Sequence, residues 1–151
     1  SPMNTLYLED FTPGSTFDLG AVAVSEADMI GFARQFDPQP FHLDPDAAAQ
    51  SPFGGLVASG WHTAALCMRL LVDGLLVRTA TLGSPGIDAL RWLRPLRPGD
   101  TLHLRATVSA VRPSESKPDR GVLTLHLEAY NQKGEALLSM EGVNFVRRAP
   151  S

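Results

Sequence analysis

The chain has 151 residues, enough for one domain with its own hydrophobic core, and its hydrophobic fraction of 44% is usual for a globular protein. Thirteen basic and sixteen acidic residues give a formal net charge of −3 without any basic run, which argues against a nucleic-acid groove or a membrane-surface helix. The single cysteine, Cys67, cannot form an internal disulfide, and this fits a reducing compartment. The sequence therefore predicts one cytoplasmic domain that binds neither nucleic acid nor a membrane.

The predicted domain covers residues 3–148. Ser1 and Pro2 precede the first methionine, Met3, and we interpret them as a remnant of the expression vector. The residues that follow lack the basic start and the long apolar stretch of a signal peptide. We therefore begin the fold prediction at Met3.

After an N-terminal strand, two helices are predicted in the first third of the chain. The first has Ser25 as its N-cap and carries apolar residues at helical spacing as far as Phe36. The second opens at Asp44, a cap residue that is followed by a proline at the first helical position, and ends before Pro52. Both helices are short and flank the same loop.

That loop, residues 37–42, places a carboxylate and an imidazole in one segment that contains two prolines. A proline restricts its own φ and pushes the preceding residue toward extended geometry, and we expect Asp37, Gln39 and Phe41 to be non-helical. Asp37 and His42 are then held close together. Such a pair is suited to acid-base chemistry.

The longest periodic stretch runs from Ser59 to Val77 and carries apolar residues on nearly every face of a helix. Its length resembles that of a membrane span, but charged residues within it would be costly at bilayer depth. Arg69 and Asp73 are spaced to pair along its single polar stripe. We therefore expect a buried core helix in a soluble protein.

Four strands are predicted after this helix, because apolar and polar residues alternate with a period of two. Turn residues separate them, which favours hairpin connections. One long helix followed by four successive strands indicates an antiparallel sheet wrapped around a central helix, in the α+β class. The predicted strands cover 87–93, 102–110, 123–129 and 136–146.

Three ordered segments of the chain resemble the MaoC-like dehydratase family, whose members include (R)-specific enoyl-CoA hydratases of hot-dog fold. The first is FARQFDPQPFHLD, which covers 32–44 and contains the family's hydratase motif. The second is FGGLVASG, at 53–60, and the third is LRWLRP, at 90–95, followed by RPGD at 97–100. The resemblance extends from about Phe11 to Val146.

The resemblance implies a single hot-dog domain that forms a homodimer or a dimer of dimers. It also implies hydration of a trans-2-enoyl-CoA to the (R)-3-hydroxyacyl-CoA, or the reverse dehydration. Coenzyme A would then be part of the substrate, and no separate cofactor is expected. By the same analogy Asp37 is the base that activates water, and His42 shares in proton transfer.

Four further residues are candidate substrate contacts, and a fifth is a candidate oxyanion donor. The backbone amide of Gly60, at the start of the central helix, is placed to stabilise negative charge on the thioester oxygen. Gln39 stands where the family commonly has asparagine. The candidate substrate contacts are Gln39, Ser59, Trp61 and Arg94.

Each candidate also has a purely structural interpretation. The N-cap role at the start of the central helix would by itself explain Ser59. For Trp61 and Met68 we prefer the interpretation as core residues. Arg94 can bind a coenzyme A phosphate or simply keep the surface soluble, as can Arg91 and Arg97. Asp44 is interpreted as a helix cap.

No metal site is predicted, because His62, His103 and His126 show no ligand spacing relative to the loop that carries Asp37 and His42. Two alternative functions remain open. One keeps the fold and hydrolyses an acyl-CoA thioester, with water activated toward the carbonyl carbon. The other is a non-catalytic acyl-binding or assembly subunit.

Overall fold

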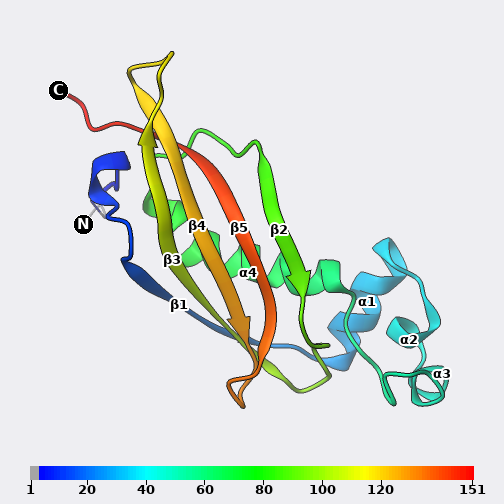
Figure 1. Cartoon of the computed structure of the whole chain (residues 1–151). Coiled ribbons are helices and arrows are strands. Elements are labelled where there is room, and N and C mark those ends of the chain that lie inside the picture. Colours follow the sequence, from blue (N-terminus) through cyan, green and yellow to red (C-terminus); the bar gives the residue numbers. More distant parts are fainter. Residues whose placement is uncertain (1–3) are drawn as a thin grey trace.

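A curved antiparallel sheet packs on one long helix in the computed structural model, which describes residues 4–151 (Figure 1). The interpretation of Ser1 and Pro2 as a vector remnant concerns residues outside this range. All neighbouring strands are antiparallel, and their order in the sheet is β1-β3-β4-β5-β2. The strands are β1 (Thr16–Ala23), β2 (Gly86–Trp92), β3 (Thr101–Pro113), β4 (Arg120–Tyr130) and β5 (Ala136–Arg147).

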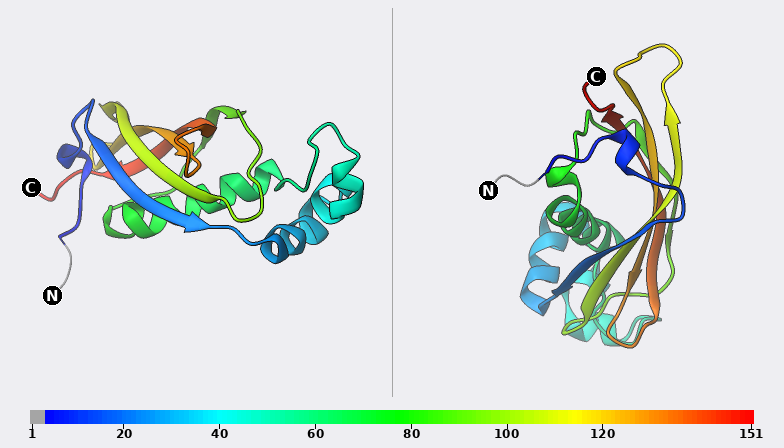
Figure 2. Two further views of the ribbon diagram at one scale, coloured as in Figure 1. Left: turned by 90° about the horizontal axis from the view of Figure 1, so that it is seen from below. Right: turned by 90° about the vertical axis from the view of Figure 1, so that its left-hand side faces the viewer.

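The long helix α4 (Gly60–Gly74) crosses one face of the sheet and is followed by the short 3-10 turn η2 (Leu76–Arg78). Figure 2 shows the strands curving over this helix. Three shorter helices form a cluster that extends beyond one end of the sheet. They are α1 (Glu26–Phe36), α2 (Pro40–Leu43) and α3 (Pro45–Ala49), and a further 3-10 turn, η1 (Leu8–Asp10), precedes β1.

The core lies between the sheet and α4, because buried residues alternate along β4 and along most of β3 and β5. On β3 and β4 the alternate leucines, from Leu102 to Leu127, are almost completely buried. From α4 the side chains of Cys67 and Leu71 complete this core, and burial raises the pKa of the Cys67 thiol to about 12. A neutral, buried Cys67 fits its predicted structural role.

The predicted α+β class is confirmed, and so are the hairpins β3–β4 and β4–β5. The predicted hairpin between β2 and β3 is wrong, because β2 pairs with β5 at the other side of the sheet. The strand ends shift slightly. The strand β2 begins one residue earlier than predicted and ends at Trp92, and β3 continues beyond Ala110 to Pro113. A bulge between Val108 and Ala110 interrupts the alternation there, which explains why the pattern alone ended the strand early.

The prediction that the central helix is fully buried is wrong. Trp61, Met68 and Val72 are 58%, 44% and 37% exposed, so the helix buries one side and leaves an apolar face open. The core assignment of Trp61 and Met68 is wrong for the same reason. The predicted pair of Arg69 and Asp73 is confirmed, with 2.7 Å between Nε and Oδ2.

The segment Gly60–Arg78 is long and apolar enough to cross a membrane by length and composition alone. In the fold it lies across the sheet and buries Cys67, Leu71 and Leu75 against it. The helix itself ends at Gly74, whereas the sequence pattern predicted continuation to Val77. Packing against the sheet therefore explains why one side of this segment is apolar.

The hairpin of β3 and β4 depends on a residue without a side chain at Gly121. A Cβ atom there would lie 2.4 Å from Leu8 Cδ2 and 2.5 Å from the carbonyl oxygen of Arg112. Because a backbone atom cannot move away cheaply, Gly121→Ala should lower the free energy of unfolding by about 1–3 kcal/mol, measured by urea denaturation. Gly31→Ala is the control, because nothing lies within 4 Å of a Cβ on that helical glycine and no loss is expected.

Candidate active site

Asp37 lies at the C-cap of α1, where the helix stops and the chain turns toward α2. Ser25 starts this helix as predicted, since its hydroxyl accepts a hydrogen bond from the Asp28 N–H. At the other end the Asp37 N–H donates to the Ala33 carbonyl. Pro38 then prevents the helix from continuing. The carboxylate is thereby presented at a defined helix end.

The imidazole of His42 reaches the same carboxylate from the short helix α2. Pro40 occupies the first position of this helix, so Phe41 is helical, and the prediction that it is extended is wrong. A proline at a first helical position favours the helix that follows it, and its restriction acts only on the preceding residue, Gln39, which is the extended N-cap. Asp37 and Gln39 are non-helical as predicted.

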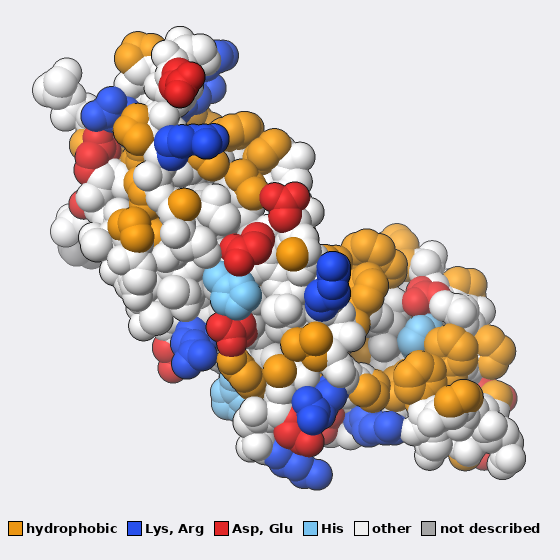
Figure 3. Space-filling model, viewed as in Figure 1, with side chains coloured by type: hydrophobic (Ala, Val, Ile, Leu, Met, Phe, Trp, Pro, Cys, Tyr) orange, Lys and Arg blue, Asp and Glu red, His pale blue; other side chains and the backbone are white. Residues whose placement is uncertain are grey.

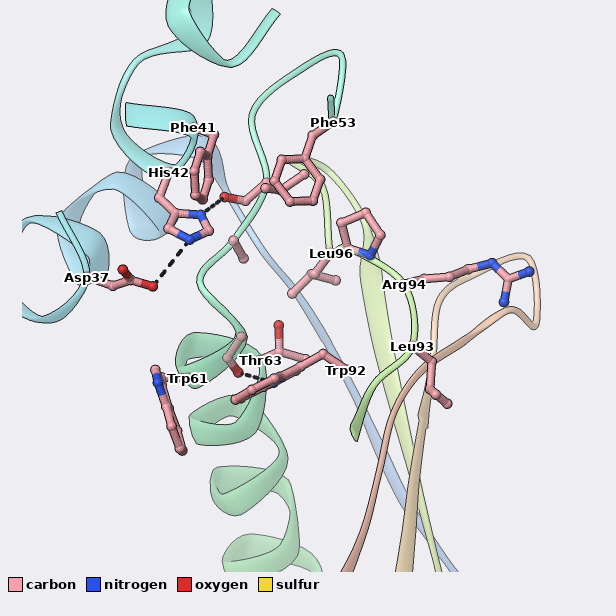
Figure 4. Close-up of a pocket in the computed structure, with 14 residues that line it drawn as sticks. Asp37, Phe41, His42, Phe53, Trp61, Thr63, Trp92, Leu93, Arg94 and Leu96 are labelled. Atoms are coloured by element: carbon pink, nitrogen blue, oxygen red, sulfur yellow. Dashed lines mark hydrogen bonds and ion pairs between the residues drawn. The ribbon is translucent and has the colours of Figure 1, made fainter. Parts of the chain in front are cut away.

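Asp37 and His42 form a close pair, with 3.2 Å between the carboxylate Oδ2 and the imidazole Nε2 (Figure 4). The other ring nitrogen, Nδ1, lies 2.7 Å from the carbonyl oxygen of Val57. A carbonyl oxygen can only accept, so Nδ1 carries a hydrogen and donates it. This contact fixes the imidazole so that Nε2 faces the carboxylate.

The hydrogen-bond pattern requires one proton between the two groups. With Nδ1 protonated, Nε2 of a neutral imidazole has only a lone pair, and an ionised Asp37 has only acceptors. Two acceptors at this distance would repel each other, so the pair is stable only with a proton on Nε2 or on Oδ2. The pair therefore contains one transferable proton.

Two neighbouring side chains hold the Asp37 carboxylate. The Gln39 side-chain amide donates to Oδ1 at 2.6 Å, and the Ser59 hydroxyl donates to Oδ2 at 2.7 Å. Burial alone would raise the pKa of Asp37, but the hydrogen bonds from Gln39 and Ser59 and the charge of His42 together lower it. The lowered pKa favours the ionised form of the Asp37 carboxyl.

Ser59 is the N-cap of α4 as predicted, and it also binds Asp37, a contact that the sequence did not predict. Its hydroxyl oxygen accepts a hydrogen bond from the Trp61 N–H as the N-cap of α4, and it donates to Asp37. The side chain is completely buried. Ser59 is therefore placed to orient the carboxylate and does not form part of an open surface.

Next to this group lies a cavity of about 430 Å³, seen as a hollow beside exposed hydrophobic side chains in Figure 3. Asp37 and His42 border it, and so does Gly60, the first residue of α4. Most of the wall is apolar, as is typical for sites that bind organic ligands. Its aromatic residues are Phe41, Phe53, Trp61 and Trp92.

Gly60 sits where the sequence placed a candidate amide donor. Among residues 4–151 no hydrogen-bond acceptor faces its N–H, as expected in the first turn of a helix. Position 60 has no room for a side chain, because the indole of Trp92 covers it. The close neighbour that excludes a side chain at position 60 is therefore a tryptophan of the protein itself.

The three arginines that recur in the sequence have different environments. Arg94 borders the cavity, but its side chain extends away from Asp37 and His42 in Figure 4, and its Nε lies 3.5 Å from Glu135 Oε2. Arg97 donates to the Phe53 carbonyl at 2.8 Å, which ties two loops at the cavity together. Arg91 does not line the cavity and donates to its neighbour, the Leu90 carbonyl.

Asp44 caps α3 as predicted, because its carboxylate accepts a hydrogen bond from the Asp46 N–H at 2.9 Å. Within residues 4–151, no three His, Cys, Asp or Glu side chains are grouped to hold a metal ion. His62, which lies on α4, is buried and stacks on Phe32 of α1 with 4.7 Å between ring centroids. This stack joins the two helices that carry Asp37 and Ser59.

Sequence reasoning missed two groups at this site. The Val57 carbonyl orients His42, but a main-chain contact leaves no signal in residue types. Trp92 lies in the segment LRWLRP, but residue types alone do not show that the end of β2 meets the start of α4. Both contacts depend on how distant segments pack.

Replacing the amide that donates to Asp37 should weaken the stabilisation of its charged form. In Gln39→Leu the Asp37 pKa should rise toward its ordinary value, measured by carboxyl ¹³C NMR titration. A lowered folded-state pKa contributes stability above the ordinary carboxyl range and loses it as the pH falls through the lowered value. Gln39→Leu should therefore reduce stability at neutral pH, while Gln50→Leu, outside the dyad, should change neither. An unchanged Asp37 titration would contradict this role of Gln39.

Comparison with solved structures supports the fold. A protein from Mycobacterium tuberculosis described as having a double hot-dog fold superimposes with a TM-score of 0.79 over 97% of this chain and 46% of its own, at 19% identity. The MaoC-like dehydratase from Rhodospirillum rubrum has a TM-score of 0.89 and 46% identity, covering 97% of this chain and 99% of its own. The predicted hot-dog fold is thereby confirmed.

Two further proteins have names that describe an activity. The 3-hydroxybutyryl-CoA dehydratase of Methylorubrum extorquens is 30% identical over 120 residues, which is 76% of this chain and 71% of that protein. The (R)-hydratase from A. caviae involved in PHA biosynthesis is 25% identical with a TM-score of 0.72, and the match covers 94% of this chain and 99% of its own. The sequence model of the MaoC-like domain matches residues 10–129. This chain therefore belongs to the MaoC-like domain family.

Proposed function

We propose that this protein is a hydro-lyase that adds water to a trans-2-enoyl-CoA to give the (R)-3-hydroxyacyl-CoA, and that it catalyses the reverse dehydration. The observation that carries this proposal is the 3.2 Å contact between Asp37 and His42 at the edge of an apolar cavity. The similarity to a 3-hydroxybutyryl-CoA dehydratase and to an (R)-hydratase supports the reaction class.

In the proposed reaction Asp37 is the base and His42 is the acid. Asp37 takes a proton from water while the water oxygen bonds to C3 of the enoyl group. The π electrons move toward C2 and the thioester oxygen, and His42 Nε2 gives its proton to C2. Transfer of the proton from Asp37 to His42 across their contact then restores the starting state. The single proton of the pair makes this assignment balance.

The negative charge that develops on the thioester oxygen requires a donor, and we assign this role to the Gly60 amide. This amide lies in the first turn of α4, where unpaired N–H groups and the helix dipole favour negative charge. In enzymes with such donors, removing one costs about 2.7–4 kcal/mol of transition-state stabilisation. The amide would thus matter as much as either side chain.

The remaining candidates bind or orient the substrate in this proposal. Trp61 borders the cavity and would contact the acyl-pantetheine portion, while Arg94 at the rim would meet a coenzyme A phosphate. Gln39 donates to Asp37, so we propose that it acts through the base. Coenzyme A enters as part of the substrate, and no other cofactor takes part.

We also propose that the protein works as a cytoplasmic homodimer. The open face of α4 includes Met68 and Val72, and the edge strand β2 exposes Ile87 on a surface with no partner in the described chain. An open apolar face and a free sheet edge favour association with a second copy. A dimer of dimers would bury another part of the surface in addition to the α4 face and the β2 edge.

The catalytic assignment predicts large losses without unfolding. Asp37→Asn and His42→Gln should each reduce the hydration rate of crotonyl-CoA by about 10²–10⁴, measured by loss of enoyl thioester absorbance. Gln50→Leu, on the exposed end of α3, should keep the wild-type rate. Rates within about tenfold of wild type for both dyad variants would sink the assignment.

The same assay separates the alternative functions. Release of free thiol without loss of the enoyl group would indicate thioester hydrolysis and would overturn the hydratase proposal. Tight binding of acyl-CoA without turnover over several chain lengths would instead indicate an acyl-binding subunit. A hydrated product with intact thioester supports the proposal.

The dimer proposal predicts a change of mass on charging the open face of α4. Size-exclusion chromatography with light scattering should give twice the mass of one chain for wild type. Met68→Glu should shift the protein toward the mass of one chain, because a buried unpaired charge is costly. Ser116→Glu, in the exposed β3–β4 turn, should not. A wild-type mass equal to one chain would refute the dimer.

A further inference from the structure

The indole of Trp92 lies directly against the start of α4. A Cβ atom on Gly60 would be 2.4 Å from Trp92 Cε2 and 2.6 Å from Nε1. Contacts this short do not occur between ordinary side-chain atoms, so any residue other than glycine would have to displace the indole. The position of the Trp92 indole therefore explains why residue 60 is a glycine.

Three contacts keep the indole in one orientation. Its Nε1–H donates to the Gly60 carbonyl at 2.7 Å, and its ring meets that of Trp61 edge-on at 5.1 Å. The third contact is the packing on Gly60 itself. Trp92 is still 45% exposed and borders the cavity, as Figure 4 shows. One part of the ring therefore covers the peptide of Gly60, and another part faces the site.

The contact joins the two walls of the cavity. Trp92 is the last residue of β2, and the segment after it, residues 93–96, forms the wall opposite α4. On the other side, Gly60 directly follows Ser59, whose hydroxyl donates to Asp37. A movement of Trp92 would thus change the position of the Gly60 peptide relative to the carboxylate.

We propose that Trp92 is a positioning residue that holds the Gly60 peptide so that its N–H can meet the substrate oxygen. This inference rests on the proposed function, because it assigns the work of the Gly60 amide to that reaction. Trp92 acts through Gly60 and takes no part in proton transfer. A preorganised donor stabilises the transition state more than the bound substrate, so its loss lowers kcat more than it raises KM.

The first test removes the indole N–H and keeps an aromatic ring. Trp92→Phe should lower kcat for crotonyl-CoA by about three- to tenfold, as expected for one lost hydrogen bond, and leave KM within about twofold. Val77→Ala is the control, an exposed apolar residue outside the cavity. A Trp92→Phe enzyme with wild-type kcat, or with a changed KM alone, would overturn the positioning role.

A double-mutant cycle tests the steric part without relying on turnover. Gly60→Ala should lower the Tm by roughly 4 to 10 °C, because its methyl group overlaps the indole. In a Trp92→Ala background the same change should cost little, because the overlap is gone. Equal Tm losses in both backgrounds would show that Trp92 is not what restricts position 60.

A spectroscopic test separates this inference from the proposed function. The chain has two tryptophans, so Trp61→Phe leaves Trp92 as the single indole fluorophore. Saturating butyryl-CoA should change its emission if Trp92 borders the bound ligand. If Trp61→Phe shows this change and the wild-type protein hydrates no enoyl-CoA, the hydratase is refuted while Trp92 stays in the site. Unchanged emission at saturation would refute the placement of Trp92.

Discussion

The carboxylate of Asp37 joins three segments that are separated along the chain. It ends α1, faces His42 on α2, and accepts a hydrogen bond from Ser59 at the start of α4. Burial disfavours the ionised carboxylate, whereas the hydrogen bonds from Gln39 and Ser59 and the charge of His42 favour it. Removing any of them would therefore raise the pKa of Asp37.

The Val57 carbonyl determines which ring nitrogen of His42 faces Asp37. Because it accepts the Nδ1 hydrogen of His42, only Nε2 is left to exchange a proton with Asp37. In the proposed reaction, the one proton that the pair shares lets Asp37 act as base and His42 as acid, a division that the motif alone leaves open. A main-chain acceptor is well suited to this purpose, since it cannot change its protonation state.

The hot-dog architecture brings the start of α4 to the edge of the sheet, where β2 ends. There Trp92 covers Gly60, which borders the cavity and whose N–H has no acceptor among residues 4–151. The same helix presents Met68 and Val72 to solvent on its other side. One helix therefore serves the core, the site and an open apolar surface, and this explains why its sequence is apolar on nearly every face.

Residue patterns were sufficient for the α+β class, the hairpins β3–β4 and β4–β5, the cap at Ser25 and the pairing of Arg69 with Asp73, because these depend on neighbours in sequence. They did not show that β2 pairs with β5, which is distant in sequence. They were also sufficient to single out Asp37 and His42, which lie five residues apart in a stiff loop. Patterns misjudged the burial of Trp61 and the helical state of Phe41. Burial depends on what packs against a face, and the effect of Pro40 depends on which side of it the helix forms. The orientation of His42 by Val57 and the closure of position 60 by Trp92 were decided only by the tertiary structure, since both join segments that meet only when the sheet wraps around α4.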